Sequence, residues 1–215
     1  MLDQLAAGPR WIRLGLAALV LVIVAGVGFS GGVFVGSASA DKPATPDTNS
    51  AEAGFARDMS THHGQAVELA LTAYPKATRA EVRTWAYDIA TSQQYQIGQM
   101  QTWLEGWGLS PTSDRRAMAW MPNGVNELRP DGLMPGMATD AERAQLRAAT
   151  GTQVDILFCQ LMIRHHLGGI HMIEGLLQLS GNDRVRTLAE SMRAGQQNEV
   201  AMMQQLLKDL GAPQS

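Results

Sequence analysis

The chain repeats itself at a fixed distance of 103 residues, and this internal duplication is the feature that most constrains its fold. The segment Phe55-Ala-Arg-Asp-Met59-Ser-Thr-His62-His63 is matched by Phe158-Cys-Gln-Leu-Met162-Ile-Arg-His165-His166. The same offset relates Val82 to Val185, Gln93 to Gln196, Met100 to Met203 and Leu104 to Leu207. No insertion interrupts either copy, so the sequence predicts two equivalent structural units.

Each copy has the pattern of a helical hairpin. Between residues 51 and 74 the apolar residues recur at three, four and seven positions, and Pro75 ends this predicted helix. A second helix from about 78 to 107 stops at Gly108, where a left-handed cap forms easily. The second copy predicts a helix from about 152 to 179, a turn at Gly181-Asn182-Asp183, and a further helix that ends at Leu210. Two hairpins that bury their apolar faces on each other give an all-α, ferritin-like four-helix bundle built from a duplicated helical hairpin.

The segment between the copies is predicted to cross from one hairpin to the other. We expect a flexible linker at 39–50 and a bundle at 51–215, with hairpin repeats at 51–107 and 151–211 joined by a methionine-containing crossover at 108–150. Within the crossover, Thr139 followed by Glu142 predicts a capping box at the start of a short helix. A connection of this length resembles the ferritin-like crossover.

The N-terminus, residues 1–38, has the composition of a cytoplasmic stub followed by a transmembrane helix. An apolar stretch from Ile12 to Val35 is long enough to span a bilayer, and Arg10 and Arg13 at its start place the N-terminus in the cytoplasm. The alternative is a cleaved signal peptide, because Ala38-Ser39-Ala40 has the small residues of a cleavage site. Both interpretations place the bundle outside the cytoplasm, as a single-pass membrane protein or, after cleavage, as a secreted one.

Charge and cysteine content exclude several classes of protein. The formal net charge is -3, and no basic patch or run indicates nucleic-acid binding. The single cysteine, Cys159, cannot form an intramolecular disulfide, so the exported domain must be stable without one.

Helical geometry directs both histidine pairs toward the core. At 100° per residue, His62 and His63 fall on the same side of their helix as Met59, and His165 and His166 do the same in the second copy. His171, the fifth histidine, falls on the outer face. Folding each hairpin brings the following helix beside its histidines, which places four glutamines against the rings: Gln93, Gln94, Gln196 and Gln197.

Four buried imidazoles need partners for their ring nitrogens, since an unsatisfied buried polar group costs about 1–3 kcal/mol. One interpretation is a metal-free polar layer, in which the rings bond to each other, to the glutamines and to water. The other is a copper site in which the glutamines hold the ring orientation. Its predicted ligands are His62, His63, His165, His166, Met59 and Met162. Thioether sulfur favours Cu(I), and the absence of a Glu-x-x-His motif argues against a di-iron site.

Other sulfur atoms are secondary metal candidates. The crossover contains Met118-Ala-Trp-Met121 and Met134-Pro-Gly-Met137, two methionine pairs of identical spacing. These four thioethers either cap one end of the bundle or face solvent as a Cu(I) uptake site. Cys159 is either a soft ligand or a small buried hydrophobe.

These motifs together resemble the family called domain of unknown function 305. The resemblance is carried by the two Met-x-x-His-His segments, the Gln-Gln-x-x-[Ile/Val]-x-x-Met segments that follow them, and Met134-Pro-Gly-Met137, over about residues 51 to 210. It implies an exported or membrane-anchored bacterial protein of ferritin-like fold, in a family with some copper-associated members. It also implies functional roles for Met59, His62, His63, Met134, Met137, Met162, His165 and His166. The chain departs from the family pattern at two places. Gln96 stands at a position that is commonly acidic, and Leu167-Gly-Gly follows the second histidine pair.

The sequence therefore predicts a membrane-anchored, extracytoplasmic protein that binds copper for storage, buffering or delivery to an exported partner protein. It predicts a binding protein more than an enzyme. Two alternatives stay open: a metal-free bundle that docks on a membrane complex, and a metal-dependent oxidase, which would need an open coordination position.

Overall fold

The structure, a computed structural model, describes residues 45–214, and its regular structure in this range is entirely helical. It contains five α-helices and one short 3-10 helix: α2 (Ala51–Ala73), α3 (Ala80–Gly106), η2 (Gly124–Glu127), α4 (Asp140–Ala148), α5 (Thr152–Leu179) and α6 (Asp183–Asp209). The prediction of an all-α fold is confirmed.

Helices α2, α4 and α6 begin at a residue whose side chain accepts a hydrogen bond from a free N–H group of the first turn. Ser50 accepts a hydrogen bond from the backbone N–H of Ala53 at the start of α2, and Asn182 accepts one from Val185 at the start of α6. The predicted capping box of α4 is present, because Thr139 Oγ1 accepts from the N–H of Glu142 and the Glu142 carboxylate accepts from the N–H of Thr139.

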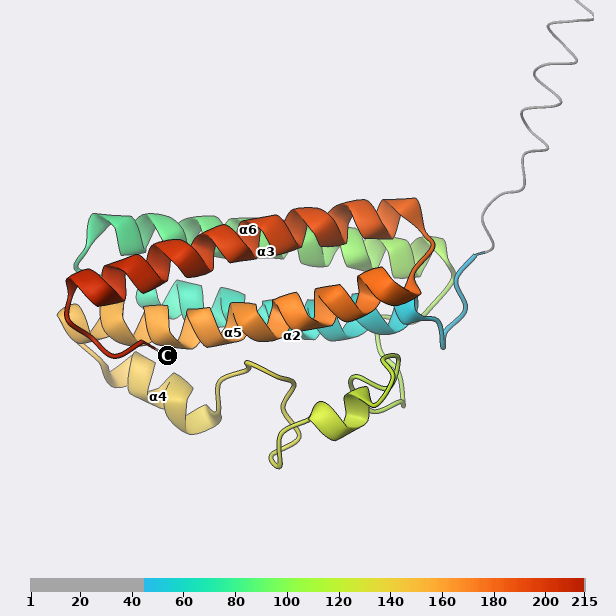
Figure 1. Cartoon of the computed structure of the whole chain (residues 1–215), viewed down its shortest axis with the longest axis horizontal. Helices are drawn as coiled ribbons and strands as arrows, with labels where there is room; N and C mark the ends of the chain where they lie inside the picture. Colours follow the sequence, from blue (N-terminus) through green and yellow to red (C-terminus); the bar gives the residue numbers. More distant parts are fainter. Residues whose placement is uncertain (1–44, 215) are drawn as a thin grey trace, which may run out of the picture. The chain divides into compact units, whose positions relative to one another are not determined.

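The four long helices form two hairpins that pack together through α2 and α5 (Figure 1). Helix α2 packs on α3, α5 packs on α6, and α3 and α6 line a common groove. Two apolar clusters fill the interior. One joins the C-terminal half of α2 to the N-terminal half of α5, and the other joins the opposite halves of these helices. Helices α2 and α5 are therefore antiparallel, and the middle of each lies between the clusters.

The crossover between α3 and α5 runs along the side of the bundle formed by α2 and α5 (Figure 1). It starts at the end of the bundle where α3 stops and returns to the opposite end, where α5 begins. Glu68 of α2 forms ion pairs with Arg143 and Arg147 of α4, and His171 of α5 bonds to Glu127 of η2. The crossover thus covers one side of α2 and α5, whereas α3 and α6 pack on their other side.

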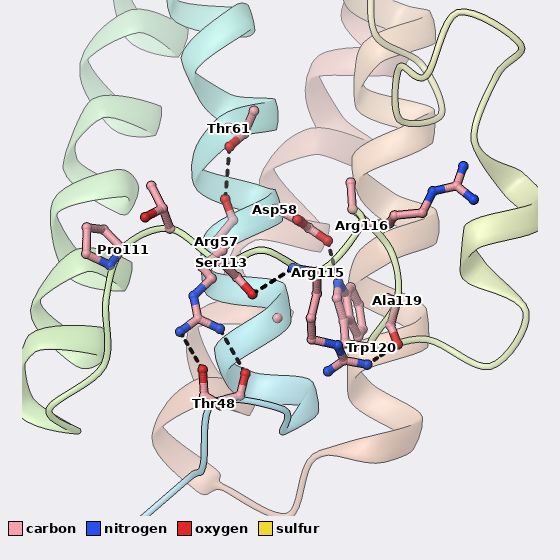
Figure 2. A pocket seen from close by; sticks show the side chains of 13 residues that line it. Thr48, Arg57, Asp58, Thr61, Pro111, Ser113, Arg115, Arg116, Ala119 and Trp120 are labelled. Carbon is pink, nitrogen blue, oxygen red and sulfur yellow. Dashed lines mark hydrogen bonds between the residues drawn. The ribbon is translucent and has the colours of Figure 1, made fainter.

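The start of the crossover is fixed by polar side chains of α2 (Figure 2). The buried Arg57 donates to Thr48 and to the backbone carbonyl of Ser110, and Asp58 accepts from the N–H of Met118 and from Trp120 Nε1. A cavity of about 230 Å³ lies among these groups, and its lining contains none of the histidines. Arg57, Asp58 and Arg115 in its lining already have protein partners, so we interpret it as part of the packing between the crossover and α2.

The predicted membrane anchor and residues 39–44 of the predicted linker lie outside the described residues. Among the helices of residues 45–214, none is both long enough and apolar enough to cross a bilayer.

Candidate metal centre

The two histidine pairs meet at the middle of the bundle. His62 and His63 lie halfway along α2, and His165 and His166 lie halfway along α5, each at most 1% exposed. Because apolar clusters fill both ends of the bundle, the four rings form a polar layer between them. We call these four residues the histidine layer. The rings of His62 and His165 lie against each other with centroids 3.8 Å apart.

Every ring in the histidine layer uses its Nε2 atom for a hydrogen bond to oxygen. His62 bonds to the carbonyl of Pro135 at 3.1 Å, and His165 bonds to the carbonyl of His62 at 3.0 Å. His63 bonds to Gln96 Oε1 at 2.8 Å, and His166 bonds to a Glu199 carboxylate oxygen at 2.5 Å. These oxygens can only accept, so Nε2 carries the proton in each neutral ring.

That tautomer leaves a lone pair on each Nδ1 atom. Among residues 45–214, the buried Nδ1 atoms of His62, His63 and His166 have no hydrogen-bond partner. A buried polar atom without a partner is destabilising, and three occur in one layer. An imidazole that donates one N–H to oxygen and keeps the other nitrogen free is the usual state of a metal-binding histidine.

Burial keeps three rings of the layer neutral. It lowers the pKa of His62 to about 4 and that of His63 to about 3, and it lowers the pKa of His165 well below its ordinary value. The neighbouring imidazoles lower these pKa values further, since one protonated ring would repel the next. At neutral pH these three rings are therefore available as uncharged nitrogen ligands.

The glutamines predicted to hold the rings divide into two groups. Gln93 and Gln196 are buried, and their Oε1 atoms have no hydrogen-bond partner within the described residues. Gln94 and Gln197 are exposed and form no hydrogen bond with the layer in that range, so the structure does not bring them to the rings. Gln96 and Glu199, three positions after the buried glutamines, hold His63 and His166 instead. The helical repeat of three to four residues from Gln93 was the signal that could have identified them.

The unusual Gly168-Gly169 pair is required by close packing at the layer. A Cβ atom on Gly168 would lie 2.0 Å from the carbonyl oxygen of Pro135, the same oxygen that accepts from His62. A Cβ atom on Gly169 would lie 2.6 Å from Gln196 Oε1. The two glycines therefore allow the crossover and α6 to approach α5 closely, just after the second histidine pair.

The predicted methionine ligands Met59 and Met162 are fully buried and contribute to different apolar clusters. The cluster that contains Met59 is rich in thioethers, since seven further methionines belong to it: Met100, Met118, Met121, Met134, Met137, Met172 and Met192. The four crossover methionines are buried, so they do not form a solvent-facing uptake site. They pack over the bundle core instead.

Cys159 is buried in the cluster that contains Met162. Burial, together with the nearby Asp155 and Glu81 carboxylates, raises the pKa of its thiol to about 12. Since the thiolate is the form that binds metals, Cys159 behaves here as a small buried hydrophobe.

Within residues 45–214, no three His, Cys, Asp or Glu side chains converge into a group that could hold a metal ion. The four imidazoles therefore do not form a ready-made cage.

Fold and site together define a duplicated helical hairpin with a buried histidine layer at its centre. The chain belongs to the family described as Domain of unknown function (DUF305), whose profile matches residues 52–207. The resemblance found in the sequence is therefore confirmed.

Two solved structures of this family are similar to the chain. A presumed secreted protein from Streptomyces coelicolor is 40% identical, with a TM-score of 0.71, over 79% of this chain and 99% of that one. A fragment from Deinococcus radiodurans is 32% identical, with a TM-score of 0.62, over 78% and 99%.

The protein CopM is a more distant structural neighbour. Its Cu(II)-bound form is 25% identical, with a TM-score of 0.60, over 75% of this chain and 97% of that one. Its Cu(I)-bound form is 23% identical over 74% and 96%, with a TM-score of 0.58, and this match shows similarity of fold alone. No curated protein sequence matches the chain.

Proposed function

We propose that this protein binds copper in the histidine layer and stores, buffers or delivers it outside the cytoplasm. The observation that carries the proposal is the set of buried Nδ1 atoms without partners on His62, His63 and His166. Each of these rings bonds to oxygen through Nε2, which leaves Nδ1 free for a metal ion. Burial also keeps His62 and His63 neutral. In a metal-free polar layer the same atoms would need buried water as their partner, because each one left unsatisfied costs about 1–3 kcal/mol.

The donor atoms near the layer favour copper over harder metals. Imidazole nitrogen suits several transition metals, but thioether sulfur selects Cu(I). Met59 and Met162 supply buried sulfur at the sequence positions three residues before each histidine pair. Because no three imidazoles converge within the part of the chain that the structure describes, methionine sulfur completes the proposed ligand set. The methionine-rich cluster, including Met134 and Met137, provides further soft donors.

The likeness to CopM, whose structures are described as Cu(I)-bound and Cu(II)-bound, supports this choice of metal. We further propose that the chain is exported and held at the membrane by residues 12–35, with the bundle outside the cytoplasm. The likeness to a presumed secreted protein supports the export. Storage or delivery at that location fits a protein that holds its ion in a buried layer.

The test is to titrate the purified full chain with Cu(I) and Cu(II) and to compare it with the double variant His62→Ala/His165→Ala. We expect stoichiometric binding by the wild type and at least a tenfold loss of affinity in the double variant, because one ring from each helix is removed. The matched control is His171→Ala, which removes the exposed histidine outside the layer.

Unchanged binding by the double variant would exclude the histidine layer as the copper site. Weak, non-stoichiometric binding by the wild type would favour the metal-free bundle, and co-purification with a membrane protein would then identify its partner.

A further inference from the structure

The two halves of the histidine layer differ by one charge. His63 and His166 occupy equivalent positions, and each bonds through Nε2 to a side chain 33 residues further along the chain. That side chain is the neutral amide of Gln96 in the first copy and the carboxylate of Glu199 in the second. The duplication thus provides an internal comparison in which ring, atom and spacing are kept and only the charge changes.

Glu199 is the carboxylate that contacts the layer. The charged residues close to the histidines in sequence face the crossover instead: Asp58 bonds to Met118 and Trp120, and Arg164 pairs with Glu142. Three of the rings are held neutral by burial. Of the two side chains that hold His63 and His166, Glu199 is the one that has a carboxyl group, and this side chain is 23% exposed.

A buried site favours an ion that neutralises its own charge, because an uncompensated charge in a medium of low dielectric constant is unfavourable. With one carboxylate beside the layer, a monovalent ion gives a neutral assembly, whereas a divalent ion leaves one positive charge unbalanced. A second carboxylate at position 96 would reverse this preference.

We infer that Glu199 and Gln96 set the charge of the bound ion, and that the single carboxylate matches the layer to a monovalent soft cation such as Cu(I) or Ag(I). The inference rests on the proposed function, because it assigns an oxidation state to the same site. Gln96 is then a specificity-determining position: its neutral side chain disfavours Cu(II). Neither residue is a ligand in this scheme, since both act through the ring that they contact.

The test compares three single variants of the full chain with wild type: Gln96→Glu, Glu199→Gln and Gln94→Glu. The last is the matched control, because it adds the same charge two residues away on the exposed face of the same helix. Affinities for Cu(I), Cu(II) and the redox-inert Ag(I) are measured by competition with chelators. The one-electron midpoint potential of bound copper is measured independently, and circular dichroism checks that each variant is folded.

We expect Gln96→Glu to raise the preference for Cu(II) over Cu(I) by roughly tenfold or more, which lowers the midpoint potential by about 59 mV or more. Glu199→Gln should shift the potential in the opposite direction and weaken Ag(I) binding. Gln94→Glu should leave all values within about twofold of wild type, because water screens its charge.

A Gln96→Glu variant with the same potential and the same Cu(II) preference as Gln94→Glu would overturn the inference while the copper site stands. If Gln96→Glu does not fold, an unchanged potential in Glu199→Gln has the same consequence. A wild-type chain that binds neither Cu(I) nor Ag(I) at the layer would overturn the proposed function and this inference with it.

Discussion

The two hairpins are nearly equivalent in sequence, but their histidines have different partners. In the first copy, His62 bonds to Pro135 of the crossover and His63 to Gln96. In the second copy, His165 bonds to the backbone of His62 and His166 to Glu199. The crossover has no counterpart in the repeat, and it contacts the two central helices unequally. The duplication therefore brings the rings together, whereas the crossover makes the two halves of the layer unlike.

The positions that face the crossover show the same divergence. Gln65 bonds through its amide to both the N–H and the carbonyl of Ala138, whereas its counterpart Gly168 lies directly beneath Pro135. The first copy therefore binds the crossover through the Gln65 side chain, whereas the second copy has a glycine at the equivalent position, where a side chain would clash with the crossover.

The largest effect should come from acid, which acts on the layer as a whole. The pKa of His62 is about 4 in the folded chain against 6.5 in the unfolded chain, so between these values the unfolded chain binds more protons. The stability of the metal-free protein should therefore fall as pH decreases through this window, by about 3 kcal/mol for this ring alone. Urea unfolding at pH 7, 6, 5 and 4 measures the loss.

In the His62→Ala variant, the dependence of unfolding free energy on pH should be shallower between pH 6.5 and 4 by the contribution of this ring. His171→Ala, which alters an exposed ring, should keep the wild-type slope. Parallel curves for wild type and His62→Ala would show that the buried ring does not titrate as its surroundings require.

The duplication and the helical period were enough to predict which histidines are buried. The constant offset placed His62 and His165 at equivalent mid-helix positions, and the 100° rotation per residue turned both pairs inward and His171 outward. Burial follows from the local pattern of a single helix once that helix is amphipathic, so the second helix of the pair need not be known.

Contacts between helices could not be predicted in the same way. Folding the hairpin about its turn predicts that Gln94 and Gln197 lie beside the rings, but the relative height of two helices depends on the conformation of the turn and on the packing of side chains. A displacement of two residues along α3 separates Gln94 from Gln96, the residue that reaches His63. The contact of Pro135 with His62 was also outside sequence reasoning, because it depends on the path of an irregular crossover over α2 and α5.

A smaller effect should follow from filling the space that the second copy leaves for the crossover. Gly168→Ala would place a methyl group 2.0 Å from the Pro135 carbonyl oxygen, so the crossover must move and the hydrogen bond from His62 must lengthen or break. We expect a loss of unfolding free energy of about 2 kcal/mol, the usual cost of overpacking. Thermal or urea unfolding measures it.

The control for this change is Gly64→Ala in the first copy. A Cβ atom on Gly64 would meet no neighbouring atom within 4 Å, so this variant should be stabilised by up to about 1 kcal/mol through helix propensity. Equal stabilities of the two variants would mean that the crossover does not rest on Gly168.

The smallest effect should come from a substitution on the outer face of the bundle, because the residues there do not contact the histidine layer. His171 bonds to Glu127 at 2.7 Å, and its counterpart Glu68 pairs with Arg143 and Arg147, so each copy contacts the crossover through an exposed polar group. Exposed pairs contribute about 0–1 kcal/mol because water and salt screen them. His171→Ala should therefore change the unfolding free energy by less than about 1 kcal/mol and leave copper affinity unchanged. A loss of copper affinity in this variant would place a metal ligand on the outer face and would break the distinction between the buried pairs and the fifth histidine.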